Sequence, residues 1–229
     1  MIGQRIVRGD VRPGDPLPTG EEWAAMLCVS RTAFRECIKV LAGKGLIEAR
    51  PKTGTRVRPM EMWNHLDPDV LAWRFDAGSD EDARELFELR RVVEPAAAEF
   101  AASRATPEQV AELEHAYRDM AEVADDSQLF EAPDLRFHQL ILRMTGNKLV
   151  HALAALIETA LTTSFRLTSD NPAGQRHSLP LHRAIVDAIA AADPATARAA
   201  TLALLESAEA DVHDAATARA TRARSARTR

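Results

Sequence analysis

The sequence predicts a mostly α-helical protein of two parts, a small N-terminal winged helix-turn-helix and a C-terminal all-helical bundle. Residues 14–58 read as two short amphipathic helices, a tight turn and two strand-like runs. After residue 76, long amphipathic segments follow one another with clear helix-start signals. Aromatic residues make up only 5% of the chain, and alanine is abundant, which favours packed helices over a β-sandwich.

The winged domain is expected over residues 1–59, starting with a short helix at residues 2–8. Thr19 and Glu22 form a T-x-x-E capping box, so a second helix should begin directly after it. Ser30 can cap a third helix, in which apolar residues recur at helical spacing. These signals predict two helices joined by a tight turn.

The third helix has a polar face that carries Arg31, Thr32 and Arg35 near its N-terminus. A helix that reads DNA needs this division, with an apolar stripe on its own domain and polar residues directed at bases and phosphates. The runs 46–50 and 55–58 then form a hairpin with Gly54 in its turn. The alternative is an amphipathic helical pair with a solvated basic face.

Charge separates the two parts of the chain. Residues 1–58 hold 11 Lys and Arg against 6 Asp and Glu, a net charge of +5, whereas the whole chain carries −5. Residues 59–229 therefore carry −10. A basic module on an acidic body is the electrostatic footprint of DNA binding.

The acidic part is expected to comprise a linker with a connecting helix at 60–76, a helical effector and dimerisation domain at 77–215, and a disordered basic tail at 216–229. The tail holds five arginines and no acid. The bundle should have six or seven helices. They are expected at about 79–103, 106–123, 128–144, 147–168, 176–191 and 194–215, the second with a capping box at Thr106 and Gln109.

Three residues of the bundle form a candidate metal site. Asp134 and His138 lie one turn apart on one predicted helix, and His182 lies on a later helix. An oxygen and nitrogen ligand set of this kind suits Zn, with Ni or Mn as alternatives. From the residues alone, a hydrogen-bonded pair without metal is the competing interpretation.

Three more residues are candidates for binding an effector. The guanidinium of Arg90 suits a carboxylate, although a surface ion pair with a neighbouring glutamate such as Glu94 is the alternative. Asn147 and Ser178 could add neutral donors for hydroxyls.

The N-terminal segment resembles the GntR family of bacterial transcription regulators. The matching residues are Gly14, Leu17, Pro18, Val29, Ser30, Arg31, Arg35, Glu36, Leu41, Gly45, Leu46, Ile47, Gly54 and Val57. The resemblance implies that Arg31, Thr32 and Arg35 contact operator DNA, with Gly54 at the minor groove. Glu21 stands where many members have an arginine, so that contact is expected to be lost or moved.

The rest of the chain resembles the FCD effector domain of the FadR subfamily. The matching pieces are Glu88-Leu89-Arg90, Val93-Glu94-Pro95, Ala101-Ala102, Asp134, Phe137-His138, Asn147, His182, Ile185, Ala188-Ile189, Asp193-Pro194 and Ala197. The resemblance implies a metal at Asp134, His138 and His182 and a pocket faced by Arg90. Leu204 occupies the place of a usual fourth histidine ligand.

The stretch from Trp63 to Trp73 is similar to the linker of the galactonate-responsive regulators of this subfamily, which implies a sugar-acid effector. We therefore expect a cytoplasmic, homodimeric DNA-binding regulator, most simply a repressor of sugar-acid (galactonate- or gluconate-type) catabolism that the effector releases. The alternatives are a regulator that responds to another small carboxylate, a fatty-acyl-responsive regulator of the same fold, and a metal-dependent enzyme.

Overall fold

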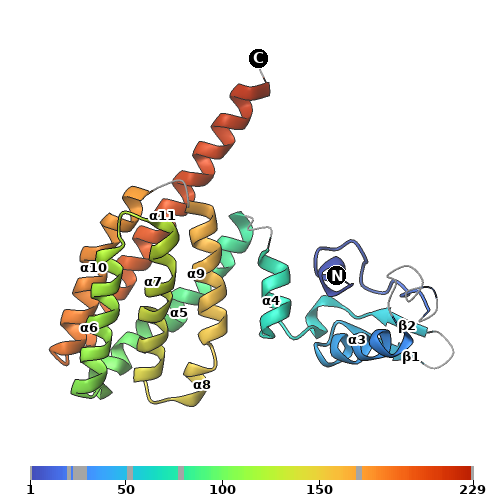
Figure 1. Cartoon of the computed structure of the whole chain (residues 1–229), viewed down its shortest axis with the longest axis horizontal. Coiled ribbons are helices and arrows are strands. Elements are labelled where there is room, and N and C mark those ends of the chain that lie inside the picture. The colour runs from blue at the N-terminus through green and yellow to red at the C-terminus, as the bar shows by residue number, and fades with distance from the viewer. Residues whose placement is uncertain are drawn as a thin grey trace. The chain divides into compact units, whose positions relative to one another are not determined.

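The computed structural model describes residues 2–19, 22, 30–50, 54–76, 80–168 and 172–227. The chain divides into two compact units, residues 1–77 and 78–229 (Figure 1). The first holds a two-stranded sheet among short helices, and the second is entirely helical over its described residues. The mostly α-helical fold with a wing, expected from the sequence, is confirmed.

The N-terminal unit begins with α1 (Ile2–Val7), and its central helix is α3 (Arg31–Gly43). Ser30 caps α3 by accepting a hydrogen bond from the backbone N–H of Ala33 at 3.1 Å. The capping box of Thr19 and Glu22 is also formed, with the Thr19 N–H donating to Glu22 at 2.7 Å. The helix expected after that box lies outside the described residues.

The wing consists of β1 (Ile47–Arg50) and β2 (Gly54–Val57), paired antiparallel with Ile47 opposite Val57. Ile47 and Val57 are buried, which docks the hairpin onto the core of the unit. The turn residues 51–53 lie outside the described part of the chain. Gly54 opens β2 with a φ of +81°, a conformation that glycine adopts without steric cost.

Residues 60–76 belong to the N-terminal unit and not to a free linker. They form a short 3₁₀ turn, η1 (Met60–Met62), and α4 (Pro68–Phe75). Trp63 and Val70 are buried in the same core as Ile2 and Ile6 of α1. The expected domain boundary at residue 59 therefore moves to residue 77, because the apolar face of α4 needs α1 to cover it.

A lysine holds this segment against the end of α3. The Nζ of Lys44 lies 2.7 Å from carboxylate oxygens of both Asp67 and Asp69. Asp67 also caps α4 by accepting from the N–H groups of Asp69 and Val70. In addition, the N–H of Asn64 donates to the carbonyl of Lys44 at 2.9 Å. The end of α3 and the start of α4 are therefore held together by charge and by backbone bonds.

The second unit is a bundle of seven helices among the described residues. They are α5 (Asp80–Arg104), α6 (Pro107–Glu122), α7 (Ser127–Met144), α8 (Lys148–His151), α9 (Ala154–Thr168), α10 (Pro172–Ala190) and α11 (Pro194–Arg227). Their apolar faces enclose one continuous core that includes Leu113, Phe137, Ile157 and Ile185. The capping box at Thr106 and Gln109 is present.

Three boundaries in the bundle differ from the sequence-based prediction. The segment 147–168 is divided into α8 and α9, and α10 begins at Pro172, because proline suits the first turn of a helix. The helix expected to end near residue 215 continues to Arg227, which corrects the prediction of a disordered tail over residues 216–227; residues 228 and 229 lie outside the described part of the chain. Alanine and arginine both favour helix, which extends α11 beyond the other helices of the bundle (Figure 1).

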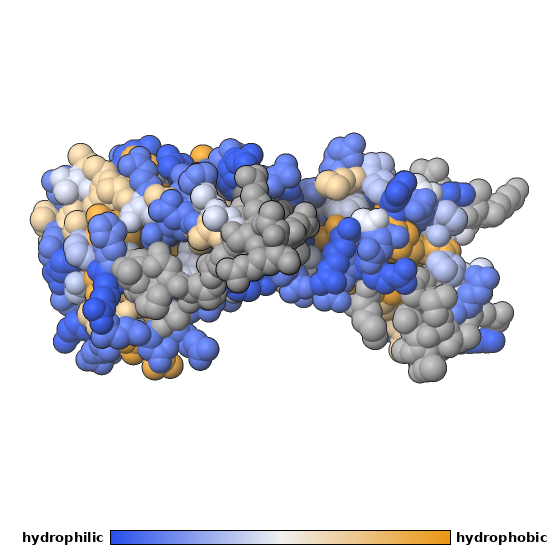
Figure 2. Space-filling view, turned by 90° about the horizontal axis from the view of Figure 1, so that it is seen from above, coloured by the Kyte–Doolittle hydropathy of each residue, from blue (hydrophilic) through white to orange (hydrophobic). Residues whose placement is uncertain are grey.

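The surface seen in Figure 2 is mainly hydrophilic over the described atoms of both units, with hydrophobic residues scattered among them. Val92 and Leu149 are among the exposed large hydrophobic side chains. In the described parts of the chain, no helix combines the length and apolar character that crossing a membrane requires.

Gly45 offers a test of how residues 60–76 pack against the end of α3. Its φ is +76°, and a Cβ at this position would lie 2.5 Å from the carbonyl oxygen of Met62. We expect Gly45→Ala to lower the free energy of unfolding of the N-terminal unit by about 2 kcal/mol or more, because backbone strain and a backbone clash add. All three tryptophans lie within residues 1–77, so denaturant unfolding followed by tryptophan fluorescence reports on this unit.

Gly14→Ala is the matched control. Gly14 has a φ of +88°, but nothing lies within 4 Å of a Cβ placed there. That variant should lose only the stability that backbone strain costs, about 1 kcal/mol. Equal losses in the two variants would show that the contact with Met62 is unimportant.

Candidate functional site

The three predicted metal-ligating side chains come together inside the bundle. Asp134 and His138 lie one turn apart on α7, and His182 reaches them from α10. The three residues are only 3%, 4% and 2% exposed, and one potential ligand atom from each lies within 4.8 Å of the others. The Nε2 of His182 is 3.0 Å from Asp134 Oδ1, and the Nε2 of His138 is 3.9 Å from Asp134 Oδ2.

The other ring nitrogen of each histidine is held by a neighbouring acceptor. The Nδ1 of His138 lies 2.8 Å from Glu94 Oε2, and the Nδ1 of His182 lies 2.9 Å from the carbonyl oxygen of Ser178. The edge of Phe137 packs against both rings. Protons on the two Nδ1 atoms leave both Nε2 lone pairs directed at Asp134, which is how metal-binding histidines are usually oriented.

The donor set fits a divalent metal ion. The Nε2 of His182 is buried and has no hydrogen bond within the described residues, although Asp134 is close to it. A buried nitrogen without a hydrogen bond costs free energy unless another ligand satisfies it. Two imidazole nitrogens and one carboxylate oxygen also match the ligands that Zn and similar ions take. Leu204, at the place of a fourth histidine, brings an apolar side chain to the cavity instead.

Buried charge surrounds the three residues. Arg90 on α5 is 2.6 Å from Glu94, and both side chains are buried. Burial by itself would raise the pKa of Glu94, but the charges of Arg90 and His138 outweigh it and lower that pKa to about 2. Burial also raises the pKa of Asp134, but His182, His138 and Arg90 together outweigh it, so this pKa too lies below its ordinary value. Both carboxyls are therefore ionised at neutral pH, which favours a cation beside Asp134.

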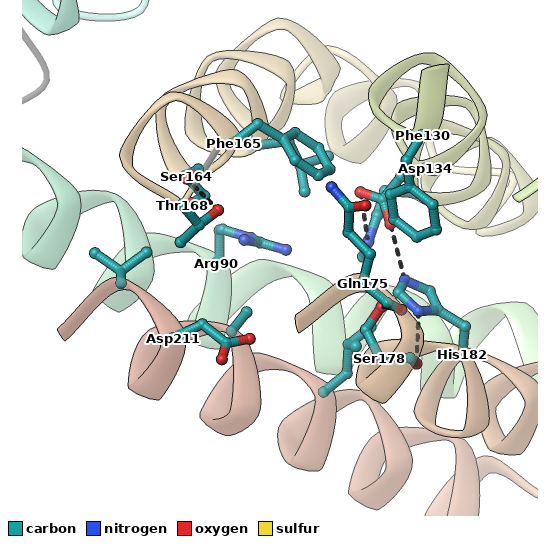
Figure 3. A pocket seen from close by; sticks show the side chains of 15 residues that line it. Arg90, Phe130, Asp134, Ser164, Phe165, Thr168, Gln175, Ser178, His182 and Asp211 are labelled. Carbon is teal, nitrogen blue, oxygen red and sulfur yellow. Dashed lines mark hydrogen bonds and ion pairs between the residues drawn. The ribbon is translucent and has the colours of Figure 1, made fainter. Parts of the chain in front are cut away.

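A cavity of about 80 Å³ opens beside the three residues (Figure 3). Arg90 and Ser178 line it, as expected for effector-binding residues. Arg90 is therefore neither a surface residue nor free, since it contacts Glu94 and borders the cavity at once. Asn147 is a correction: it is exposed and caps α8 by accepting from the N–H of Leu149 at 2.9 Å, away from the cavity.

Sequence analysis missed several residues of the cavity wall and the support beneath it. The sequence predicts Glu94 only as a possible surface partner of Arg90. The other missed residues are Phe130, Ser164, Phe165, Thr168, Gln175 and Asp211. Several lie one turn from a predicted residue, as Phe130 does from Asp134 on α7, so helical spacing could have pointed to them once the inner face of each helix was known.

The candidate DNA-binding residues are separate from this cavity. Arg31, Thr32 and Arg35 are exposed on α3, while Phe34 and Leu41 on its other face are buried. Gly54 is exposed at the start of β2. The helix thus exposes its polar N-terminal residues and docks through its apolar stripe, the division that a recognition helix needs.

Comparisons with known proteins agree with both units. Residues 1–57 match the model of the bacterial regulatory proteins of the gntR family, and residues 85–207 match the FCD domain. The galactonate operon transcriptional repressor of Escherichia coli is 34% identical over 210 residues, which cover 90% of this chain and 91% of that protein. The regulator LutR of Bacillus subtilis is 29% identical, covering 89% and 94% of the two chains.

The solved structure of a GntR protein from Streptococcus agalactiae superposes with a TM-score of 0.54 at 28% identity, over 89% of this chain and 93% of that one. Proteins related in this way are DNA-binding regulators and not enzymes. The comparisons thus exclude the metal-dependent enzyme that the metal-ligand set left open.

The buried carboxylate of Glu94 gives a prediction for stability and pH. We expect Glu94→Gln, studied with a chelator present, to lower the free energy of unfolding at neutral pH by about 3–5 kcal/mol, because Arg90 is left buried without its counter-charge. The pKa of Glu94 falls from 4.5 to about 2 on folding. Its contribution is therefore complete above about pH 4.5 and is lost as the pH falls toward 2, so the two proteins should converge in acid.

Urea unfolding followed by far-ultraviolet circular dichroism measures this difference across the pH range. Glu99→Gln is the control on the same helix, since Glu99 forms an exposed pair with Arg198 at 3.1 Å. Exposed pairs contribute about 0–1 kcal/mol. If both variants lost equally little free energy of unfolding, the buried ion pairs of Glu94 would not stabilise the protein as expected.

Proposed function

This chain belongs to the GntR family of bacterial regulatory proteins with an FCD domain, and we propose that it is a repressor of sugar-acid catabolism released by its effector. As a member of that family it is a DNA-binding transcription regulator. The observation that carries the finer proposal is the buried set of Asp134, His138 and His182, which opens together with Arg90 into one cavity. A small acid bound there has both a metal and a guanidinium to anchor its carboxylate.

Charge balance supports a metal in this site. With both histidines neutral, as ligation requires, Arg90 supplies one positive charge against the two negative charges of Glu94 and Asp134. A divalent ion, Zn with Ni or Mn as alternatives, would supply a Lewis acid that reverses this balance and attracts a carboxylate. Asp134, His138 and His182 would hold it, and Glu94 and the Ser178 carbonyl would keep the imidazoles oriented.

The sugar-acid assignment draws on two further facts. A relative that is 34% identical over most of its length is named as the repressor of a galactonate operon. The cavity is also small and carries an arginine and several polar side chains, which suits a compact hydroxylated acid better than a long acyl chain. Another small carboxylate remains the alternative effector.

The DNA partner is expected to be a two-fold symmetric operator bound by a homodimer. In that arrangement each half-site receives one copy of α3 in the major groove, with Arg31, Thr32 and Arg35 at its leading end and Gly54 beside the minor groove. The effector would release DNA by favouring the arrangement of the two heads that does not match the half-site spacing. A regulator of operator DNA works in the cytoplasm.

Arg35→Ala tests the DNA-binding face. A base or phosphate contact by this residue contributes about 1–3 kcal/mol, and a dimer on two half-sites loses it twice, so we expect operator binding to be abolished. Effector binding should be unchanged because the cavity lies in the other unit. A gel-shift or fluorescence-anisotropy titration measures the loss.

The matched control for this variant is Arg118→Ala, which removes the same charge from an exposed position of α6. It should leave operator affinity within about twofold. Unchanged operator affinity in Arg35→Ala would refute the assignment of α3.

His138→Ala tests the metal and effector site. We expect aldonates such as galactonate to raise the melting temperature of the wild-type protein by a few degrees, since a ligand at 100 times its Kd stabilises by about 2.7 kcal/mol. Chelator and His138→Ala should each abolish this shift, while operator binding survives. The control is His115→Ala, which replaces an exposed histidine on α6 and should keep the thermal shift. An equal shift in His138→Ala would place the effector elsewhere.

A further inference from the structure

The cavity has two chemically different ends. Figure 3 shows Asp134 and His182 on one side, Asp211 with Ser164 and Thr168 on the other, and Arg90 between them. The first side is the anchor for a carboxylate in the function proposed above. The second side, formed by α9 and α11, has no role in that proposal.

The hydroxyls on the second side can only accept hydrogen bonds from a ligand. Ser164 donates its proton to the carbonyl of Ala160, and Thr168 donates to the carbonyl of Ser164, each at 2.9 Å. A hydroxyl has one proton, so both oxygens offer lone pairs alone.

A stronger acceptor completes this wall. Asp211 extends from a stripe of α11 that otherwise brings Leu204, Ala208 and Val212 to the cavity. Within the described chain its carboxylate forms no hydrogen bond or ion pair. Burial raises the pKa of Asp211 above its ordinary value, as expected for a carboxylate turned inward.

We infer that Asp211 determines effector specificity, so that the cavity accepts a polyhydroxylated monocarboxylate and rejects a dicarboxylate. This inference rests on the proposed function, which places the ligand carboxylate at the side of Arg90 and His182. Among the described polar groups of the second side, the far end of the ligand then meets acceptors only. Hydroxyl groups satisfy these acceptors, whereas a second carboxylate finds no donor among them and faces the negative charge of Asp211.

The distribution of the acceptors favours hydroxyls over a single ammonium group. Ser164 and Thr168 belong to successive turns of α9, and Asp211 belongs to α11. An ammonium needs acceptors that converge on one point, while a chain of hydroxyls needs acceptors spread along a wall. An open-chain sugar acid carries such a row of donors.

Galactonate and galactarate are the probes for this inference, because they differ only at the far carbon, which is a hydroxymethyl group in one and a carboxylate in the other. The full chain, loaded with Zn, is titrated with each acid by calorimetry. We expect wild-type protein to bind galactonate at least tenfold more tightly, about 1.4 kcal/mol. Asp211→Asn should remove most of this preference by strengthening galactarate binding, because the amide keeps an acceptor and adds a donor.

Two more variants sharpen the test. Asp214→Asn makes the same change at an exposed position three residues along α11 and should keep the wild-type preference. Asp211→Ala removes charge and acceptor together, so it should strengthen galactarate binding and weaken galactonate binding. Circular dichroism checks that each variant is folded.

The outcomes separate the inference from the proposed function. If wild-type protein binds both acids equally, or if Asp211→Asn keeps the preference for galactonate, the sugar-acid sensor stands and the role of Asp211 is wrong. If wild-type protein binds neither acid, the sugar-acid assignment falls, and the inference falls with it.

Discussion

The buried charges that join α5, α7 and α10 are the constraint on which the effector unit depends. Arg90, Glu94, Asp134, His138 and His182 are all removed from water inside one helical bundle. Burying such groups is unfavourable unless each one has a partner in a fixed geometry. The three helices must therefore hold one register relative to each other. Among the described residues, the Nε2 of His182 is left without a hydrogen bond at the centre of this cluster, and a cavity lies beside it. A buried nitrogen without a hydrogen bond next to a cavity is typical of a binding site.

The N-terminal unit depends on a smaller version of the same principle. Lys44 at the end of α3 lies between Asp67 and Asp69 at the start of α4, with little exposure of the lysine side chain. Trp63 and Val70 are then buried in the core of the unit. Helix α3 and residues 60–76 consequently form one folded body.

The two sides of the cavity offer different interactions. One side holds the cluster of Asp134, His138 and His182 beside Arg90, and the other presents lone pairs from Ser164, Thr168 and Asp211. Apolar residues such as Phe130 and Leu204 separate these groups and lower the local dielectric. Affinity and selectivity are then divided between the two sides, because the carboxylate end is common to many acids and the far end is not.

The two-part architecture and the three residues of the candidate metal site could be predicted from the sequence. Capping residues such as Ser30 and Thr106 act on backbone groups within three residues, and the spacing of Asp134 and His138 is a property of one helix, so both can be read from local sequence. Three other features emerged from tertiary packing: Asn147 faces solvent and caps α8, residues 60–76 pack on α1, and Glu94 and Asp211 lie at the site. Those outcomes depend on which face of each helix meets a neighbour. That choice is made by packing between residues far apart in the chain, and local spacing carries no record of it.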